Sequence, residues 1–381
     1  MFIHHAFIFL IKISFMNKSF IVCVLVIISL VIVSCSARKY NEQFNSVYTL
    51  KKTVEIKTLI KDSLLNVRAL EIIDSVGAGY LTSRGELGVV FIEGLDLPKV
   101  ITERFPVKIE HDSVKLNFRA MSILKKRCYG ITIGSPALLY SLDVDAIKNK
   151  IVYKENHPKA FYDAMDFWND QEGIAIGDPT DDCMSVIITR DGGETWTKLS
   201  CDDLPKAKDG EAAFAASDTN ISIVGDHTWV ATGGKASRIM YSPDKGRTWT
   251  VYDTPIEQGK ETTGMYSIDF YDENNGFAIG GDYTKPNDTL NNKIRTVDGG
   301  KTWQVVANGK GPSYRSCVQY IPNSEANELV AVGFKGIDYS NDAGASWTHL
   351  SGEGFYTIRF LNDSTAYAAG NGRVSKLTFR E

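Results

Sequence analysis

An eight-residue pattern occurs four times in the second half of the chain, and it constrains the fold more than any other feature. It reads Ser or Thr, any residue, Asp, any residue, Gly, any residue, Ser or Thr, Trp, and its copies span residues 189–196, 242–249, 296–303 and 340–347. An Asp at this spacing can accept backbone N–H groups of a tight turn, and Gly supplies the positive φ that the bend requires. The Trp opens the next strand with a large apolar face. The pattern predicts four β-hairpins, with structural roles for Asp191, Gly193, Trp196, Asp244, Gly246, Trp249, Asp298, Gly300, Trp303, Asp342, Gly344 and Trp347.

A second repeat predicts where successive sheets begin. Seven similar triplets, each followed by a short apolar strand, recur every 40 to 52 residues: Val67-Arg68-Ala69, Phe118-Arg119-Ala120, Phe161-Tyr162-Asp163, Ala213-Phe214-Ala215, Met265-Tyr266-Ser267, Arg315-Ser316-Cys317 and Phe355-Tyr356-Thr357. This interval is close to the roughly 40–50 residues of one four-stranded propeller blade. Second strands align as well, for example residues 173–177, 276–280 and 366–370.

The repeats predict an all-β fold, in which residues 48–381 form a single β-propeller. Seven blades are expected, with six or eight as alternatives. The last unit, residues 355–379, holds only three strands, while residues 48–60 are strand-like and otherwise unassigned. We therefore expect an N-terminal strand to close the ring, which removes the exposed edges that make open sheets aggregate. The 17 Tyr, 18 Phe and 32 Gly suit many short strands joined by tight turns.

The eight-residue pattern resembles the Asp-box, or BNR, repeat of sialidases, sortilin-type receptors and photosystem II assembly-factor-like propellers. Residues 161–168, 173–179, 210–217, 280–283, 314–316 and 353–355 make the resemblance closest to the last group and its relatives in non-photosynthetic bacteria. The resemblance covers most of residues 60–380 and implies a propeller in which the box is a folding device. Such relatives are frequently labelled oxidoreductase or glycosyl hydrolase.

The N-terminus predicts export and lipid anchoring. The apolar run Phe20 to Val33 follows Lys18 and leads into Ser34-Cys35, which is the arrangement of a lipobox, so residues 1–35 are interpreted as a signal peptide and Cys35 as the lipidated residue. The run is shorter than the roughly 20 residues of a membrane-spanning helix. The true start is expected at Met16, and residues 36–47 read as a linker. Because no Asp follows Cys35, we expect the protein to be a bacterial cell-envelope lipoprotein of the outer membrane.

Four cysteines remain for the oxidising compartment in which the mature protein is expected: Cys128, Cys183, Cys201 and Cys317. Cys183 and Cys201 lie at nearly equal distances on either side of Gly192-Gly193. Antiparallel pairing around that turn could bring them opposite each other, so a disulfide between them is possible. The chain has no CxxC motif and no Cys/His cluster, so no metal site is predicted.

Composition and motifs argue against several functional classes. Forty-two Lys and Arg against 46 Asp and Glu give a net charge of −4, which provides no electrostatic basis for binding nucleic acid. No G-x-G-x-x-G joins a strand to a helix, so no nicotinamide or flavin cofactor is predicted. The Phe-Arg-Ile-Pro signature of sialidases is missing, because Phe118-Arg119 is followed by Ala120-Met121.

The mouth of the central channel is the candidate binding site, because residues just before the inner strands converge there from all blades. Three arginines could bind an anionic group through their guanidinium forks; the alternative is that each pairs with a neighbouring carboxylate and holds the blades together. The candidates are Arg68, Arg119, Tyr162, Asp163, Asp178, Glu211, Tyr266, Asp282, Tyr283, Tyr314, Arg315, Glu353 and Tyr356.

Three functional hypotheses follow. The first is a binding or assembly module that docks a protein or peptide of the cell envelope. The second is a glycan-binding protein or glycosyl hydrolase, with Glu211 and Glu353 or Asp163 as the paired carboxylates that glycoside cleavage needs. The third is an oxidoreductase, which rests on the label of the similar proteins alone. We favour the first, because the sequence contains no recognisable catalytic group.

Overall fold

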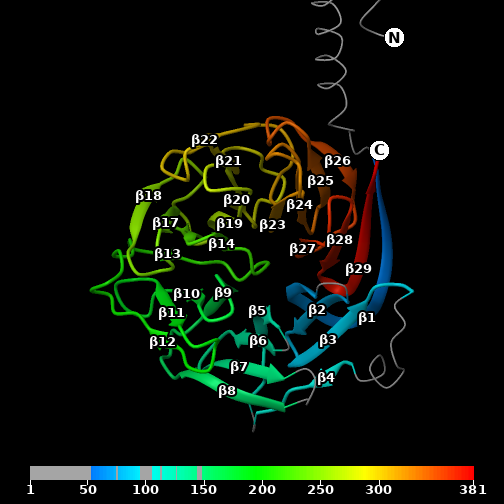
Figure 1. Cartoon of the computed structure of the whole chain (residues 1–381). Coiled ribbons are helices and arrows are strands. Elements are labelled where there is room, and N and C mark those ends of the chain that lie inside the picture. The colour runs from blue at the N-terminus through cyan, green and yellow to red at the C-terminus, as the bar shows by residue number, and fades with distance from the viewer. Residues whose placement is uncertain (1–52, 74–75, 95–104, 112–113, 126, 144–147) are drawn as a thin grey trace, which may run out of the picture. The chain divides into compact units, whose positions relative to one another are not determined.

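The computed structural model describes residues 53–73, 76–94, 105–111, 114–125, 127–143 and 148–381. These residues form six antiparallel β-sheets and contain no α-helix. The predicted signal peptide, Cys35 and the linker lie outside the described residues. The sheets surround a common centre (Figure 1). The strands near it, which we call the inner strands, are β5 (Phe118–Leu124), β9 (Tyr162–Phe167), β14 (Ile221–Val224), β19 (Thr263–Phe270), β23 (Cys317–Tyr320), β27 (Thr357–Phe360) and residues 67–73 of β1 (Thr53–Ile73). The predicted all-β class is therefore confirmed.

Four of the sheets contain four strands, arranged in chain order from the centre to the rim. They consist of β5 (Phe118–Leu124), β6 (Arg127–Thr132), β7 (Ala137–Asp143) and β8 (Lys148–Glu155); β9 (Tyr162–Phe167), β10 (Gly173–Gly177), β11 (Ser185–Thr189) and β12 (Thr197–Lys198); β14 (Ile221–Val224), β15 (His227–Ala231), β17 (Arg238–Ser242) and β18 (Thr250–Asp253); and β23 (Cys317–Tyr320), β24 (Leu329–Gly333), β25 (Gly336–Ser340) and β26 (Thr348–Ser351).

The other two sheets are larger. One contains β13 (Glu211–Ala212), β16 (Gly233–Gly234), β19 (Thr263–Phe270), β20 (Gly276–Asp282), β21 (Lys293–Thr296) and β22 (Gln304–Val305). The second has the order β27 (Thr357–Phe360), β28 (Thr365–Ala369), β29 (Asn371–Arg380), β1 (Thr53–Ile73), β2 (Gly77–Thr82), β3 (Glu86–Phe91) and β4 (Val107–Lys108).

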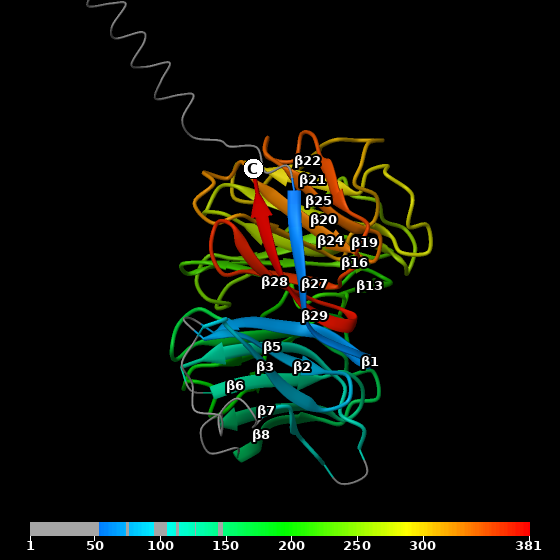
Figure 2. The ribbon, with the colours of Figure 1, turned by 90° about the vertical axis from the view of Figure 1, so that its right-hand side faces the viewer.

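Strand β1 connects two parts of the seven-stranded sheet, β27–β29 on one side and β2–β4 on the other. Its residues from Thr53 to Asn66 pair antiparallel with β29, and those from Val67 to Ile73 pair with β2. Figure 2 shows β1 and β29 side by side. Strands from the two ends of the described chain are thus joined by backbone hydrogen bonds.

The core of the described residues is divided into seven clusters. Six lie between neighbouring sheets, and the seventh lies between the β1–β3 and β28–β29 parts of the seven-stranded sheet. In one of them, Ile174 and Ile176 of β10 pack with Val230 of β15 and Met240 of β17. Because alternate residues of a strand point to opposite faces, each inner strand can contribute to the clusters on both of its sides.

The four eight-residue repeats form the turns between the last two strands of their sheets, and we call them the Asp-turns. In the turn after β21, the Asp298 carboxylate accepts hydrogen bonds from the backbone N–H of Thr302 at 2.9 Å and from its hydroxyl at 2.6 Å. The hydroxyl of Thr296 donates to Asp298 at 2.8 Å and accepts from the N–H of Gly300 at 3.0 Å. The same bonds recur in the other three turns.

One predicted strand start is wrong. The sequence suggested that an inner strand follows Ala213-Phe214-Ala215, whereas β14 begins only at Ile221. Residues 217–219 instead bond to inner strands of other sheets. The Asp218 carboxylate accepts from the N–H groups of Met121, at 2.7 Å, and Met165, at 3.1 Å. We call residues 217–219 the crossing segment.

Candidate functional site

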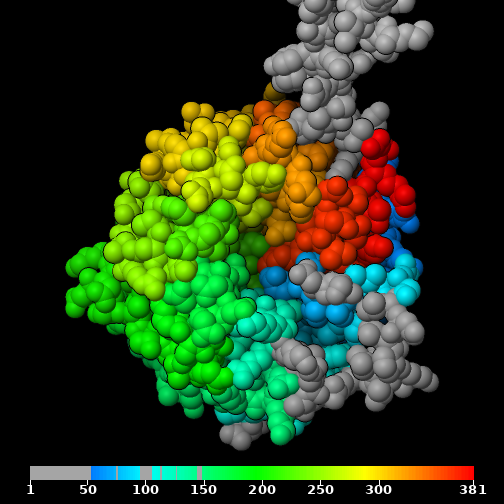
Figure 3. Space-filling model, viewed as in Figure 1, coloured from blue at the N-terminus to red at the C-terminus, as the bar shows by residue number. Residues whose placement is uncertain are grey.

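A shared irregularity of four inner strands brings charged and aromatic residues to one end of the central axis. In β1, β5, β9 and β19 one residue lies unpaired at a register shift in the ladder to the next strand; these residues are Arg68, Arg119, Asp163 and Tyr266. A β-bulge of this kind re-aims a side chain. Because the shifts occupy the same place in each strand, the four side chains gather at one end of the inner strands. Figure 3 shows that the middle of the ring is hollowed on the face in view.

Arg68 and Arg119 form the cationic part of this end. The Arg68 guanidinium lies 4.0 Å from the centre of the Tyr356 ring and also donates to the Asn66 side chain, 2.5 Å away. Arg119 donates only a long hydrogen bond, 3.4 Å, to the carbonyl of Ala215, and its buried Nε has no acceptor. Neither arginine forms an ion pair with a carboxylate in the part of the chain that the structure describes. Burial and the neighbouring Arg68 charge lower the pKa of Arg119 to about 10.

Two carboxyl groups lie next to the arginines. Asp163 is fully buried, and neither of its oxygens has a hydrogen-bond partner among the described residues. Burial raises the pKa of Asp163 well above its usual range, and the Asp178 carboxylate adds to this rise. Arg119 and the nearby backbone N–H of Ala215 oppose the rise in the pKa. Asp178 accepts a hydrogen bond from the N–H of Ala213 at 2.8 Å, yet burial raises its pKa to about 6.

Aromatic rings form a row at the same end of the inner strands. Phe214 stacks on Tyr266 with 4.0 Å between ring centres, and Tyr266 meets the edge of Tyr314 at 4.9 Å. Phe334 lies 5.3 Å from Tyr314, and Tyr283 lies 6.3 Å from Tyr266. Tyr283 and Phe334 are 48% and 44% exposed, so the row of rings reaches the surface.

We define the channel mouth by the charged and aromatic residues that these contacts bring together. It consists of Arg68, Arg119, Asp163, Asp178, Phe214, Tyr266, Tyr283, Tyr314, Phe334 and Tyr356. Phe334 was not among the predicted candidates, and Phe214 was named only as part of a strand start. Phe214 is the middle residue of its repeat triplet, as Arg68 and Tyr266 are of theirs, and that position is the signal that could have identified it. Phe334 lies in the turn between β24 and β25.

Five of the predicted candidates have other roles, because each is engaged by a partner outside the mouth. Arg315 is buried in an ion pair with Asp338, 2.5 Å, and Glu211 in one with Arg238, 2.5 Å. The exposed Glu353 pairs with Arg373. The remaining two are Tyr162, whose hydroxyl donates to Glu155 at 2.7 Å, and Asp282, which accepts from the N–H and hydroxyl of Thr284.

A second polar group lies farther along the inner strands and was missed by sequence reasoning. This group consists of Glu71, Asp166, Asp269 and Arg359, which lie three residues after Arg68, Asp163, Tyr266 and Tyr356. Together with Asp218 they line a cavity of about 200 Å³. Arg359 donates to Glu71 at 2.9 Å. Burial is the first cause that raises the pKa of Asp166 and of Asp269 to about 7. The constant spacing of three residues from the mouth residues is the sequence signal that could have identified this polar group.

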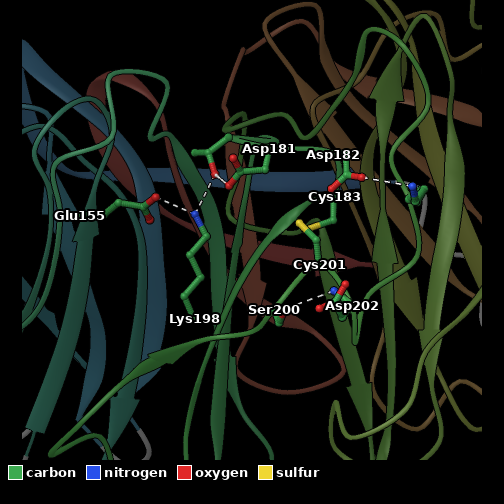
Figure 4. The surroundings of a disulfide bond; sticks show 10 residues. Glu155, Asp181, Asp182, Cys183, Lys198, Ser200, Cys201 and Asp202 are labelled. Carbon is green, nitrogen blue, oxygen red and sulfur yellow. Dashed lines mark hydrogen bonds and ion pairs between the residues drawn. A yellow bond between two sulfur atoms is a disulfide. The ribbon is translucent and has the colours of Figure 1, made fainter.

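The disulfide lies on another part of the surface. Cys183 and Cys201 are bonded, with their Cα atoms 5.4 Å apart, whereas Cys128 and Cys317 are buried free thiols. Asp181 and Asp182 lie beside the disulfide (Figure 4), and both line an open pocket of about 520 Å³. The disulfide therefore supports one wall of that pocket.

Neither a metal-binding cluster nor a membrane-spanning helix occurs among the described residues. Those residues contain no group of three or more His, Cys, Asp or Glu side chains placed to hold a metal ion. Nor does the described part of the chain include a helix of the length and apolar character needed to cross a membrane.

The fold is that of a β-propeller, as comparison with solved structures shows. The WD40 β-propeller domain of Doa1 aligns with a TM-score of 0.57 and 12% identity, covering 86% of this chain and 98% of that one. At such identity the likeness shows the fold alone. No protein-family model matches the sequence, and no curated protein matches it either.

Two further solved structures share the architecture. The structure described as YCF48 bound to D1 peptide aligns with a TM-score of 0.61 and 10% identity, covering 88% of this chain and 97% of that chain. The structure of U3-55K aligns with a TM-score of 0.57 and 10% identity, covering 86% of this chain and 98% of its own.

Proposed function

We propose that this protein is a docking module that binds a protein or peptide segment at the channel mouth. The observation that carries the proposal is the pair of partly buried arginines, Arg68 and Arg119, which have no carboxylate partner among the described residues and lie beside a row of aromatic rings. Arginine and aromatic side chains in sheltered pockets dominate the energetics of protein interfaces. An anionic group of the partner would replace the carboxylate that these arginines lack, since guanidinium pairs bidentately with carboxylate.

Two further observations support the proposal. One of the similar propellers was solved with a bound peptide. In addition, two of the three carboxylates suggested for the alternative of glycoside cleavage are engaged elsewhere, because Glu211 and Glu353 each form an ion pair with an arginine. No contact of the described residues favours the oxidoreductase hypothesis over docking.

The finer architecture and the location belong to the same proposal. We propose that the propeller has seven blades, one for each core cluster between neighbours, and that pairing of β1 with β29 closes the ring. The Asp-turns are proposed to be Asp-boxes.

Cys35 is proposed to carry the lipid that holds the propeller at the cell envelope. Metabolic labelling with palmitate and a Cys35→Ser variant would test this.

The docking proposal is tested by purifying the tagged full chain from native membranes and identifying bound proteins. We compare the wild type with Arg68→Ala/Arg119→Ala and with a control, Arg84→Ala/Arg247→Ala, which removes two exposed arginines outside the mouth. A partner that is captured by the wild type and the control is then purified and titrated. Loss of a hot spot should weaken its binding by about thirtyfold or more in the mouth variant. Equal binding by all three proteins would refute the proposal, provided that thermal unfolding shows each to be folded.

A further inference from the structure

The base of the channel mouth contains buried polar atoms that the protein itself leaves without partners. Among the described residues, no hydrogen bond of normal geometry reaches either carboxyl oxygen of Asp163 or the buried Nε of Arg119. The backbone N–H of Ala215 lies near Asp163, but too far or too poorly aligned to satisfy it. Leaving such a group unsatisfied costs free energy, and more when the group is charged. Other buried carboxylates near the inner strands are bonded: Asp218 of the crossing segment accepts from two backbone N–H groups, and Asp269 of β19 accepts from the N–H of Tyr320 at 2.7 Å. Asp163 is therefore an exception within its own fold.

The surroundings of Asp163 indicate which chemical group would satisfy it. An ionised carboxylate only accepts hydrogen bonds, so the missing partner must donate. The titratable groups that face it are Asp178, after β10, and Arg119, of β5; beyond Arg119 lie Arg68 and Tyr356. A neutral donor would leave the repulsion between Asp163 and Asp178 in place, whereas a cation would reduce it.

We infer that Asp163 and Asp178 form a subsite for the ammonium or guanidinium group of a basic side chain on the docked segment, beside the anion-binding pair Arg68 and Arg119. This inference rests on the proposed docking function and specifies its partner. The segment would carry a basic and an anionic group close together, with its apolar part against Tyr266 and Tyr314. The guanidinium groups of Arg68 and Arg119 lie beside the carboxyl groups of Asp163 and Asp178. A ligand with an anionic group next to a basic group would therefore meet the opposite charge at both positions.

The first test asks whether Asp163 is kept for binding or for folding, and it needs no ligand. Asp163→Asn removes the buried charge and retains the shape of the side chain. Measured at about pH 8, the thermal midpoint of this variant should lie about 2 °C or more above that of the wild type. Asp269→Asn serves as the control, because it removes a carboxylate that accepts a backbone hydrogen bond, and its midpoint should not rise as far. A lower midpoint for Asp163→Asn would mean that the carboxylate holds the fold together, and would overturn the inference.

The second test uses two probes that differ in a single charge. Nα-acetyl-lysine carries a carboxylate and an ammonium, whereas Nα-acetyl-norleucine has the carboxylate and an apolar chain of similar length. Calorimetric titration of the full chain should show about tenfold tighter binding of the lysine probe, the effect of one charge-assisted hydrogen bond. Asp163→Asn should abolish the difference, and Asp269→Asn should preserve it. Because the bound cation favours the ionised carboxyl, affinity for the lysine probe should increase with pH, with protons released on binding.

The outcomes separate the inference from the docking proposal. If both probes bind equally and both are lost in Arg68→Ala/Arg119→Ala, the anion site stands and the basic subsite is refuted. Failure of the lysine probe to bind also refutes the subsite, while the docking function is judged on the membrane purification alone. An affinity that falls with rising pH would show Asp163 acting as a protonated donor, and would overturn the inference as well.

Discussion

At the scale of single residues, each Asp-turn glycine allows a side chain of a neighbouring sheet to approach the turn closely. A Cβ atom at Gly344 would lie 2.1 Å from the ring of Phe277 in β20, and one at Gly193 would lie 2.5 Å from Tyr129 in β6. Both glycines also have positive φ, +84° and +80°. These turns therefore lock one sheet against the next in addition to connecting two strands.

Replacing such a glycine should destabilise the whole domain. We expect Gly344→Ala to lower the free energy of unfolding by about 3 kcal/mol, because the methyl group overpacks the Phe277 contact and alanine disfavours positive φ. Urea denaturation measures the change. Gly352→Ala is the matched control, since a Cβ there meets no atom within 4 Å and the residue is exposed. Similar unfolding midpoints for the two variants would contradict this account of the turn.

At the scale of elements, the crossing segment connects inner strands that do not pair with one another. Asp218 bonds to β5 and β9, the hydroxyl of Thr357 in β27 donates to the carbonyl of Ser217 at 2.9 Å, and the N–H of Ile268 in β19 donates to that of Thr219 at 2.8 Å. Inner strands leave one edge unpaired, and buried N–H groups on that edge need acceptors. The segment supplies acceptors that the neighbouring sheets do not provide.

The variant Asp218→Ala should show how much the crossing segment contributes to the free energy of unfolding. It removes the acceptor for the buried N–H groups of Met121 and Met165, so we expect a loss of about 3 kcal/mol of stability. Hydrogen exchange at those two amides should accelerate beyond the rest of β5 and β9. Asp218→Asn should lose less, because its amide oxygen still accepts and Asn tolerates the positive φ of +60°. Unchanged exchange at both amides in Asp218→Ala would refute this role.

The cavity at the other end of the inner strands should make stability depend on pH. Asp166 and Asp269, with pKa values near 7 in the folded protein, titrate near 3.9 when unfolded, so the folded state binds more protons between those values. Stability should therefore fall as pH rises from about 4 to 7 and change little at higher pH. Urea midpoints at several pH values measure this slope, and Asp269→Asn should flatten it. The exposed Asp209, replaced by Asn, should leave the slope unchanged, and a wild-type slope of opposite sign would contradict the prediction.

At the scale of the whole molecule, the pairing of β1 with β29 joins the two ends of the described chain. Val54 and Ile56 of β1 pack against the cluster between β23–β26 and β27–β29. A break there would expose the edges of two strands, and exposed edges promote association between chains. The stability of every sheet should then depend on this one contact.

Ile56→Asp should weaken the entire domain, because it places a charge against that apolar cluster. We expect a loss of about 3 kcal/mol in a single cooperative unfolding transition, together with concentration-dependent association visible by light scattering. Glu55→Ala, which removes an exposed partner of Arg380 on the same strand, should have little effect. Fraying of β1 alone, with an unchanged global midpoint, would show that the pairing is dispensable.

Local features of the fold could be predicted from the sequence, and features of the site only in part. The Asp-turns depend on bonds between residues at most four positions apart, and the second strand at residues 173–177 coincides with β10. The strand start at residues 213–215 was mispredicted because the bonds that hold residues 217–219 reach partners up to 141 positions away. Arg68 and Arg119 lie near each other in the structure, whereas Arg315, at a similar repeat position, pairs with Asp338 of β25 in the same sheet.

The sequence by itself determined the all-β class, the hairpin turns and the spacing of the sheets, because these follow from hydrogen bonds and alternation within a few residues. Tertiary structure alone decided which repeated polar residues remain without partners, since burial and pairing depend on the strand that lies alongside. Asp163, Asp166 and Asp269 are one residue type on equivalent strands, yet only Asp163 lacks a hydrogen bond for either oxygen among the described residues. That difference arises at the bulge in β9, which places Asp163 beside Arg119 and Asp178 and near the backbone N–H of Ala215, without a hydrogen bond of normal geometry.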